Sequence, residues 1–249
     1  ADRILVLSGS QQGIDLVAKL VVDPGTPLAV EEPSYLAALQ VFRFFGARFQ
    51  TLRPLRAGAD WDGASPGPAP ALAYVTPTFQ NPTGRCWTAA ERAELAAACD
   101  RHDVILFEDD PYRDLAYDPC DRTPICALAR SASWIYQGSF SKTVAPGLRL
   151  GFLAASEDLI APLTHLKQAA DLHSNRVSQW LVEQYLADPS RSQRMSALVG
   201  RYLSRPLAAG SALRQTDLKA RQWFAAGETV RVVAVGPGWQ VVTEGQAMS

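Results

Sequence analysis

A single lysine lies among hydroxyl side chains in residues 138–151, which read Gly-Ser-Phe-Ser-Lys-Thr-Val-Ala-Pro-Gly-Leu-Arg-Leu-Gly. The amine of Lys142 could condense with an aldehyde to form a Schiff base if the rest of the aldehyde-bearing molecule were held nearby. Ser139, Ser141 and Arg149 could bind a phosphate, because a planar guanidinium matches phosphate oxygens with two donors. The segment therefore predicts a site for a cofactor that carries both groups. Taken alone, it is also consistent with a serine-rich turn before a strand.

A second anion-binding turn is predicted near the start of the chain. Residues 4–7 are apolar and typical of a short strand, and Ser-Gly-Ser-Gln-Gln-Gly at residues 8–13 leads into a helical pattern of apolar residues. A helix N-terminus offers unpaired N–H groups and the positive end of the helix dipole, so Ser10 and Gln11 are placed where a phosphate could bind. The G-x-G-x-x-G spacing of dinucleotide-binding loops is absent. A plain helix cap is the alternative.

Polar side chains also follow two further apolar strands. Residues 71–75 lead into Thr-Pro-Thr-Phe-Gln-Asn-Pro-Thr-Gly, whose prolines and glycine fix the loop that carries Asn81. Residues 104–107 lead into Glu-Asp-Asp-Pro-Tyr, which places Asp109 and Tyr112 at the end of a strand. Such strand ends line the ligand crevice of open α/β sheets. An exposed acidic turn is the alternative, and delivery by a buried strand weighs against it.

In this order along the chain, these motifs resemble those of fold type I pyridoxal-phosphate enzymes of the aminotransferase class. Ser-Gly-Ser-Gln-Gln, Asn-Pro-Thr-Gly, Glu-Asp-Asp-Pro-Tyr and Pro-Gly-Leu-Arg-Leu-Gly are similar to the aminoadipate, kynurenine and aromatic aminotransferase branch. The resemblance implies pyridoxal 5′-phosphate as the cofactor and a homodimer as the assembly. It also implies transamination between an amino acid and a 2-oxo acid through a Schiff base on Lys142.

The resemblance implies a role for each candidate residue. Lys142, Asp109 and Tyr112 would be catalytic, with Asp109 paired with the nitrogen of the cofactor ring. Tyr112 and Asn81 would hydrogen-bond the phenolic oxygen of the ring. Tyr35, in Glu-Glu-Pro-Ser-Tyr, would stack on the ring, although a core or surface aromatic is the alternative for this residue. The residues around the phosphate would be Ser10, Gln11, Ser139, Ser141 and Arg149.

Composition argues against several other classes of protein. The chain has 249 residues, 47% of them hydrophobic, which is enough for one large domain or a domain and a half. The net charge is −1 and the basic residues are scattered, so we expect no nucleic-acid or membrane partner. There is no apolar run of ~18 residues and no signal-peptide pattern, which makes the cytoplasm the expected location. Cys86, Cys99, Cys120 and Cys126 lack C-x-x-C spacing and the three histidines form no ligand pattern, which favours structural thiols over disulfides or a metal site.

Strands alternate with helices along the chain. Residues 88–91, Thr-Ala-Ala-Glu, form a capping box that opens a helix reaching about residue 101. Residues 157–172 and 177–186 show helical spacing of apolar residues, and further strands are expected near 134–136 and 148–154. This pattern predicts an α/β fold with a mainly parallel sheet and helices on both faces. Residues 57–70, rich in alanine, proline and glycine, are expected to form a surface loop.

We expect a large cofactor-binding domain over residues 1–188 and a partial or atypical small domain over residues 189–249. The resemblance runs from about residue 4 to about residue 202, and residues 213–249 are only weakly patterned. Family members are normally longer, and their arginine for the substrate carboxylate lies in the small domain. Arg231 is a candidate counterpart, with an arginine on an edge strand as the alternative.

This difference from the family leaves two other interpretations beside an active enzyme. One is a non-catalytic sensor of pyridoxal phosphate, resembling the aminotransferase-like half of certain bacterial regulators. The other is an inactive truncated fragment.

Overall fold

The computed structural model describes residues 2–52, 69–116, 119–190, 202–203, 218–219, 229–236 and 239–246. The chain divides into two compact units, Ala1–Gln184 and Tyr185–Ser249. The predicted domain boundary after residue 188, and the assignment of the second unit as a small domain, stay predictions. Most of the loop expected at residues 57–70 lies outside the described residues.

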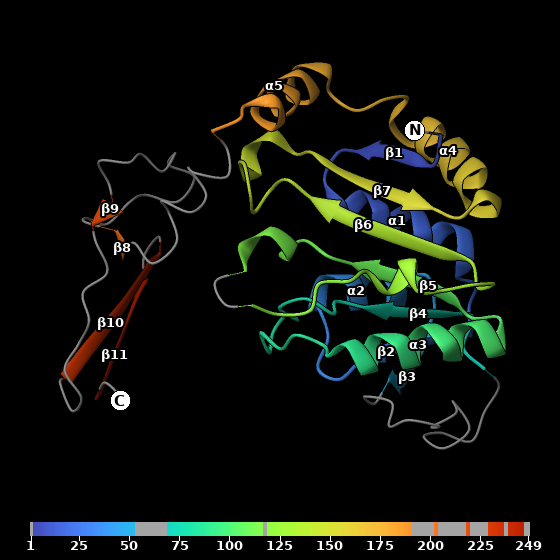
Figure 1. Ribbon diagram of the computed structural model, residues 1–249, viewed down its shortest axis with the longest axis horizontal. Helices are drawn as coiled ribbons and strands as arrows, with labels where there is room; N and C mark the ends of the chain where they lie inside the picture. Colours follow the sequence, from blue (N-terminus) through green and yellow to red (C-terminus); the bar gives the residue numbers. More distant parts are fainter. Residues whose placement is uncertain are drawn as a thin grey trace. The chain divides into compact units, whose positions relative to one another are not determined.

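A seven-stranded sheet forms the centre of the first unit, in the order β1-β7-β6-β5-β4-β2-β3. Only β7 runs antiparallel to its neighbours, β1 and β6, whereas every pairing from β6 to β3 is parallel. The mainly parallel α/β fold predicted from the sequence is therefore confirmed (Figure 1). The strands are β1 (Ile4–Leu7), β2 (Pro27–Glu31), β3 (Arg48–Leu52), β4 (Leu72–Val75), β5 (Ile105–Asp109), β6 (Trp134–Ser139) and β7 (Gly151–Ala155).

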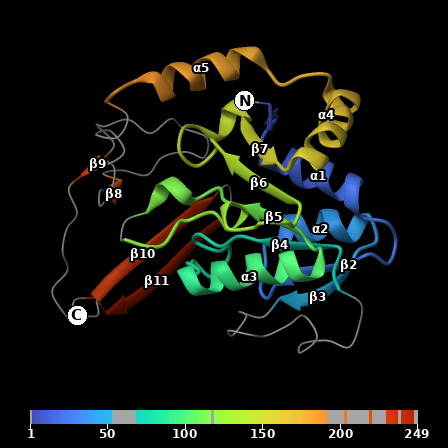
Figure 2. The ribbon, with the colours of Figure 1, turned by 45° about the vertical axis from the view of Figure 1, so that its right-hand side comes forward.

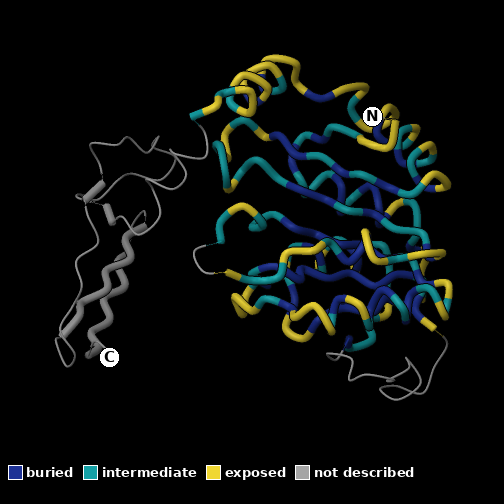
Figure 3. Tube along the Cα trace, viewed as in Figure 1, coloured by how far each residue is buried: buried dark blue, intermediate teal, exposed yellow. Residues whose placement is uncertain are grey.

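Helices cover both faces of this sheet (Figure 2). Those of the described residues are α1 (Ser10–Val21), α2 (Leu36–Phe44), α3 (Ala89–His102), α4 (Glu157–Asp171) and α5 (Arg176–Ala187). Side chains of α1, α2 and α4 pack in one buried cluster with Tyr74 and Phe107, and those of α3 pack in a second cluster with Ala73 and Leu106. Successive residues of a strand point to opposite faces, so each central strand supplies both clusters. The central strands β2, β4 and β5 are accordingly buried along most of their length, whereas the edge strands β1 and β3 are mostly half-buried (Figure 3).

The helix α3 follows the sequence prediction closely. The side chain of Thr88 accepts a hydrogen bond from the Glu91 N–H over 3.3 Å, and the Glu91 carboxylate accepts one from the Thr88 N–H over 2.9 Å. This capping box satisfies two donors that a helix start otherwise leaves unpaired. Asp103, in the left-handed conformation, ends the helix.

Two predicted strands differ in their bounds. The strand expected over residues 148–154 begins at Gly151, because residues 146–148 form a 3₁₀ turn and Arg149 has φ 47°. The strand expected to end at Phe107 continues through Glu108 and Asp109, because both pair with β6. The two acids are therefore part of the sheet and buried, which rules out the exposed acidic turn.

The second unit contains two antiparallel pairs among its described residues. The strands β8 (Tyr202–Leu203) and β9 (Leu218–Lys219) form a short pair, and β10 (Thr229–Gly236) and β11 (Trp239–Gln246) form a long one with Gly236 opposite Trp239. The weak sequence pattern did not predict this long pair. Arg231 lies in β10. None of the described helices combines the length and the hydropathy that a bilayer span requires.

Candidate active site

A cavity of about 240 Å³ lies where the carboxyl ends of the parallel strands meet. The segments that follow β1, β2, β4, β5 and β6 all reach it, because parallel strands end at the same edge of a sheet. Thr76, Pro111 and Pro146 line the cavity without having been predicted. Every residue predicted from the sequence to bind the cofactor lines it as well: Ser10, Gln11, Tyr35, Asn81, Asp109, Tyr112, Ser139, Ser141, Lys142 and Arg149.

Asp109 supplies a buried carboxylate at the floor of this cavity. It is 3% exposed, and both of its oxygens accept hydrogen bonds, Oδ2 from the Tyr74 hydroxyl over 2.8 Å and Oδ1 from Gln137 Nε2 over 3.0 Å. Burial raises the pKa of Asp109 to about 6, although the two hydrogen bonds act in the opposite direction. A cation against this carboxylate would favour the charged form and lower the pKa again.

Tyr74 and Gln137 were missed as parts of the site. Each is a polar side chain in a strand that is otherwise mostly apolar, and both are fully buried. A buried phenol or amide needs a hydrogen-bond partner. This requirement could have identified Tyr74 and Gln137 as residues that contact another buried polar group. The partner itself could not be identified from the sequence, because Asp109 lies on a strand between β4 and β6.

Glycine at position 9 makes room for the guanidinium of Arg149, which also lines the cavity. Gly9 has φ 92°, and a Cβ there would lie 2.5 Å from Arg149 Nη2. Arg149 Nη1 lies 3.5 Å from Ser141 Oγ, and the Ser141 N–H donates to Ser139 Oγ over 3.2 Å. Among the described residues, Arg149 forms no ion pair with a carboxylate. Its charge is therefore available to an anion beside the hydroxyls and the start of α1.

The loop that carries Asn81 is anchored at both ends by one carboxylate. Glu31, at the end of β2, accepts the Thr76 N–H over 2.7 Å and the Trp87 Nε1–H over 2.9 Å. Burial raises the pKa of Glu31 to about 7, and these hydrogen bonds oppose the rise. Within the loop, Asn81 Nδ2 lies 3.4 Å from the Tyr112 hydroxyl. Two donors from separate segments thus converge on one point of the cavity.

Tyr35 and Lys142 complete the lining. The Tyr35 hydroxyl lies 3.5 Å from Gln11 Oε1, and burial together with the charges of Asp109 and Tyr112 raises its pKa. Lys142 follows β6 in a turn closed by the hydrogen bond from the Val144 N–H to the Phe140 carbonyl. Its side chain is exposed and forms no ion pair with the described residues, so the amine is accessible.

The model of the family described as aminotransferase class I and II matches residues 1–221. The chain belongs to this family. This membership agrees with the fold, because solved aminotransferase structures share it. The α-aminoadipate aminotransferase of Thermus thermophilus, solved with N-(5′-phosphopyridoxyl)-L-leucine, superposes with a TM-score of 0.69 at 36% identity, over 78% of this chain and 51% of that chain.

Curated relatives of this aminotransferase-family chain include both enzymes and regulators. A 2-aminoadipate transaminase of Thermus thermophilus is 37% identical over 193 residues, which are 75% of this chain and 49% of the relative. An uncharacterized HTH-type transcriptional regulator of Bacillus subtilis, YisV, is 33% identical over 192 residues, which are 74% of this chain and 39% of the relative. The chain thus spans about half the length of the relatives it matches, or less.

The chemistry of the lining residues fits pyridoxal 5′-phosphate. An accessible amine, a buried carboxylate and an unpaired guanidinium beside hydroxyls are complementary to an aldehyde, a basic ring nitrogen and a phosphate, respectively. Among the described residues, no group of three or more histidine, cysteine or acidic side chains could hold a metal ion.

Proposed function

We propose that this chain binds pyridoxal 5′-phosphate at the cavity and takes part in transamination between an amino acid and a 2-oxo acid. The observation that carries the proposal is that Lys142, Asp109 and Arg149 line one cavity of about 240 Å³ although they come from different segments. These three groups match the aldehyde, the ring nitrogen and the phosphate of one ligand.

Lys142 would bind the cofactor covalently through its Nζ, and Asp109 would pair with the ring nitrogen. When bound, the cofactor provides a protonated ring that accepts the electron pair left when a substrate loses its α-proton. Asp109 keeps that ring nitrogen protonated if the carboxylate stays ionised, which the donors Tyr74 and Gln137 favour. Once released from the cofactor, Lys142 Nζ would carry the proton between the two reacting carbons as a general base and acid.

The remaining residues would orient the cofactor. Asn81 Nδ2 and the Tyr112 hydroxyl lie 3.4 Å apart, and both would donate to the phenolic oxygen of the ring. Tyr35 would stack on the ring from its position at the start of α2. Hydroxyl, amide and guanidinium donors would bind the phosphate, and these belong to Ser10, Gln11, Ser139, Ser141 and Arg149.

A homodimer is also part of the proposal. Large apolar side chains are exposed around the start of α5: Leu172 is 78% exposed, Val177 66% and Trp180 58%. Exposed apolar side chains that lie close together are typical of a surface that another protein covers. Sedimentation of the purified chain with and without the substitution Trp180→Ser tests this, because a weaker dimer is expected in the variant. The expected cytoplasmic location stays a prediction.

Covalent binding is tested by borohydride reduction and peptide mass spectrometry. The protein is mixed with pyridoxal phosphate and reduced, and we expect the adduct on Lys142. Lys142→Ala should lose it, whereas Lys19→Ala, which changes an exposed lysine of α1, should keep it. An adduct spread equally over the remaining lysines, or one unchanged in Lys142→Ala, would contradict a specific site.

Turnover is measured separately, as release of 2-oxo acid from an amino acid in the absence of an acceptor. The panel should include 2-aminoadipate and the aromatic amino acids, because the chain resembles that branch. An active chain releases close to one 2-oxo acid per bound cofactor.

A cofactor-sensing role is the second candidate function, and the similarity to the regulator YisV favours it. A chain that forms the Lys142 adduct but releases no 2-oxo acid from any donor would support this role. A chain that forms no adduct would support the inactive fragment.

A further inference from the structure

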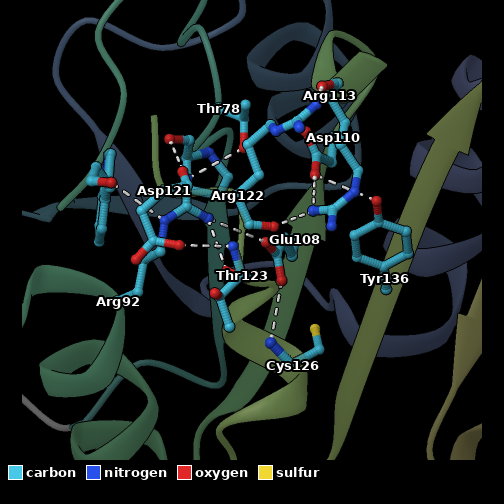
Figure 4. A network of polar contacts seen from close by, with 12 residues as sticks. Thr78, Arg92, Glu108, Asp110, Arg113, Asp121, Arg122, Thr123, Cys126 and Tyr136 are labelled. Atoms are coloured by element: carbon cyan, nitrogen blue, oxygen red, sulfur yellow. Dashed lines mark hydrogen bonds and ion pairs between the residues drawn. The ribbon is translucent and has the colours of Figure 1, made fainter. Parts of the chain in front are cut away.

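Cys86 and Cys120 lie next to two residues that contact the same buried guanidinium. Arg92, in α3, is fully buried and donates from Nε to the Trp87 carbonyl over 3.2 Å and from Nη2 to the Asp121 carbonyl over 3.0 Å (Figure 4). Each cysteine directly precedes one of these two residues. Because both carbonyls bind one small planar group, the backbone next to each cysteine is brought close to the other.

The two segments are also fixed in place. Arg92 also donates to the Pro77 carbonyl over 2.9 Å and to the Thr123 carbonyl over 3.0 Å. Pro77 belongs to the same loop as Cys86, and Thr123 belongs to the same segment as Cys120. The segment with Cys120 is closed by a reciprocal pair, in which Arg122 donates to the Arg113 carbonyl and Arg113 donates to the Arg122 carbonyl (Figure 4). A disulfide requires close side chains, and these contacts limit how far the two segments can move apart.

The thiols themselves interact. Burial, a hydrogen bond to the Cys86 side chain and the charge of Cys86 raise the pKa of Cys120, whereas Arg122 and Arg92 lower it. Both cysteines are half-buried and reachable by a small reagent, whereas Cys99 and Cys126 are buried. The structural role expected for the thiols from the sequence therefore fits the buried Cys99 and Cys126 better than Cys86 and Cys120.

We propose that Cys86 and Cys120 form a reversible disulfide when the protein meets a low-molecular-weight disulfide such as oxidised glutathione. One cysteine thiolate attacks the oxidant, which forms a mixed disulfide and releases one glutathione thiolate. The second cysteine thiolate attacks that mixed disulfide and releases the second glutathione. Two protons leave the cysteines, and two electrons pass to the oxidant, which is reduced to two glutathione molecules.

This bond would join two segments of the candidate active site. Cys86 follows Asn81 in the loop between β4 and α3, and Cys120 follows Tyr112 in the segment after β5. A disulfide would hold these two segments, one following Asn81 and the other following Tyr112, at a fixed separation. The inference goes beyond the proposed function, since the bond forms or fails to form whether or not the cofactor binds.

The experiment uses the reduced, purified protein with oxidised glutathione at about pH 8, close to the ordinary pKa of a cysteine thiol. Free thiols are then alkylated after unfolding, and the digest is analysed without reduction. We expect the peptides of Cys86 and Cys120 to be linked, Cys99 and Cys126 to be alkylated, and dithiothreitol to reverse the link. Separate glutathione adducts on the two cysteines, or a link to Cys99 or Cys126, would overturn the proposal.

The variants Cys86→Ser and Cys120→Ser provide matched controls. Each keeps one half-buried thiol and should take up a single glutathione without a crosslink. The oxidised wild-type protein should also unfold at a higher temperature than the reduced protein, by roughly 5 °C, because the bond restricts the unfolded chain. A crosslinked protein with an unfolding temperature below that of the reduced protein would show that the native fold does not position the pair.

Discussion

Gln137 donates a hydrogen bond from Nε2 to Oδ1 of Asp109 over 3.0 Å. The Gln137 side chain fits because residue 13, in the first turn of α1, is a glycine. A Cβ at Gly13 would lie 1.8 Å from Gln137 Oε1 and 2.9 Å from Leu7 Cδ1. A position outside the cavity thus controls a donor to its buried carboxylate.

We predict that Gly13→Ala weakens binding of pyridoxal phosphate by about ten-fold or more. The new methyl group must displace Gln137, and a lost hydrogen bond to a charged group costs roughly 1.5–3 kcal/mol. Titration of the purified variant with the cofactor measures the change. Gly147→Ala is the control, because no atom lies within 4 Å of a Cβ built there. Equal affinities for the two variants would show that Gln137 does not support Asp109.

We predict that the cofactor-free Asp109→Asn variant is more stable than the wild type at about pH 8. Burial raises the pKa of Asp109 from 3.8 to about 6, so its protonated form stabilises the fold below pH 3.8, and this stability is lost as the pH rises through 6. Removing the charge should recover on the order of 2 kcal/mol at pH 8 and little near pH 4. Urea unfolding at both pH values measures this.

Two comparisons make that prediction specific. Asp15→Asn, at a carboxyl about 38% exposed on α1, should change stability by less than about 0.5 kcal/mol at either pH. Saturating pyridoxal phosphate should stabilise the wild type more than Asp109→Asn, because the ring nitrogen supplies the missing cation. A variant that is less stable than the wild type at pH 8 would mean that the charged carboxylate is already compensated within the protein.

The location of the candidate site could be predicted because each residue follows a strand whose apolar pattern is local. Ser10, Asn81 and Asp109 come after or at the end of recognisable strands, and parallel strands bring such ends together. The capping box at Thr88 is a local signal of the same kind. Their roles toward the cofactor stay predictions, since they depend on the ligand.

The supporting contacts could not be predicted, because they depend on strand order and on the rotation of helices. Gln137 and Tyr74 meet Asp109 only because β5 lies between β6 and β4. Nothing in the local sequence of α3 separates Arg92 from Arg101, yet the first side chain is fully buried and the second is 43% exposed. Only the packing of α3 against the sheet distinguishes them.

Asp171 is predicted to support the phosphate end of the cavity. Its Oδ2 accepts from Ser8 Oγ over 3.0 Å and from Gln12 Nε2 over 2.8 Å, and its Oδ1 pairs with the buried Lys167. Ser8 and Gln12 flank the residues expected to bind the phosphate. Asp171→Ala should therefore weaken cofactor binding several-fold and, by leaving the buried Lys167 unpaired, destabilise the fold by about 2 kcal/mol, between the values for exposed and fully buried pairs because Asp171 is 27% exposed.

The pH dependence and a control separate this pair from an ordinary surface contact. Hydrogen bonds and the Lys167 charge outweigh burial and lower the pKa of Asp171, so its stabilising effect is present near neutral pH and is lost as the pH falls through the lowered pKa. Asp15→Ala breaks the exposed ion pair between Asp15 and Lys19, which are also four residues apart. It should lower the free energy of unfolding by less than about 1 kcal/mol. Urea unfolding and cofactor titration measure both effects, and equal losses in the two variants would contradict the prediction.

Arg92→Met should destabilise the fold by about 3–5 kcal/mol at pH 8. The substitution removes donors from buried carbonyls and leaves Glu108, whose Oε1 lies 3.7 Å from Arg92 Nη1, as an uncompensated buried acid. Burial already raises the pKa of Glu108 to about 7, so the acid is charged at pH 8 and largely protonated at pH 6. The penalty should therefore be smaller at pH 6 by on the order of 1 kcal/mol.

A double-mutant cycle with Glu108→Gln isolates the charge contribution from the lost hydrogen bonds. In the Glu108→Gln background, Arg92→Met should cost less than in the wild type and should lose its dependence on pH, because no carboxylate remains to be compensated. Arg101→Met, in the same helix and 3.4 Å from Glu94, is the control and should cost less than about 1 kcal/mol. If Arg92→Met kept the same pH dependence with and without Glu108, another group would be titrating, and the buried pair would not be the cause.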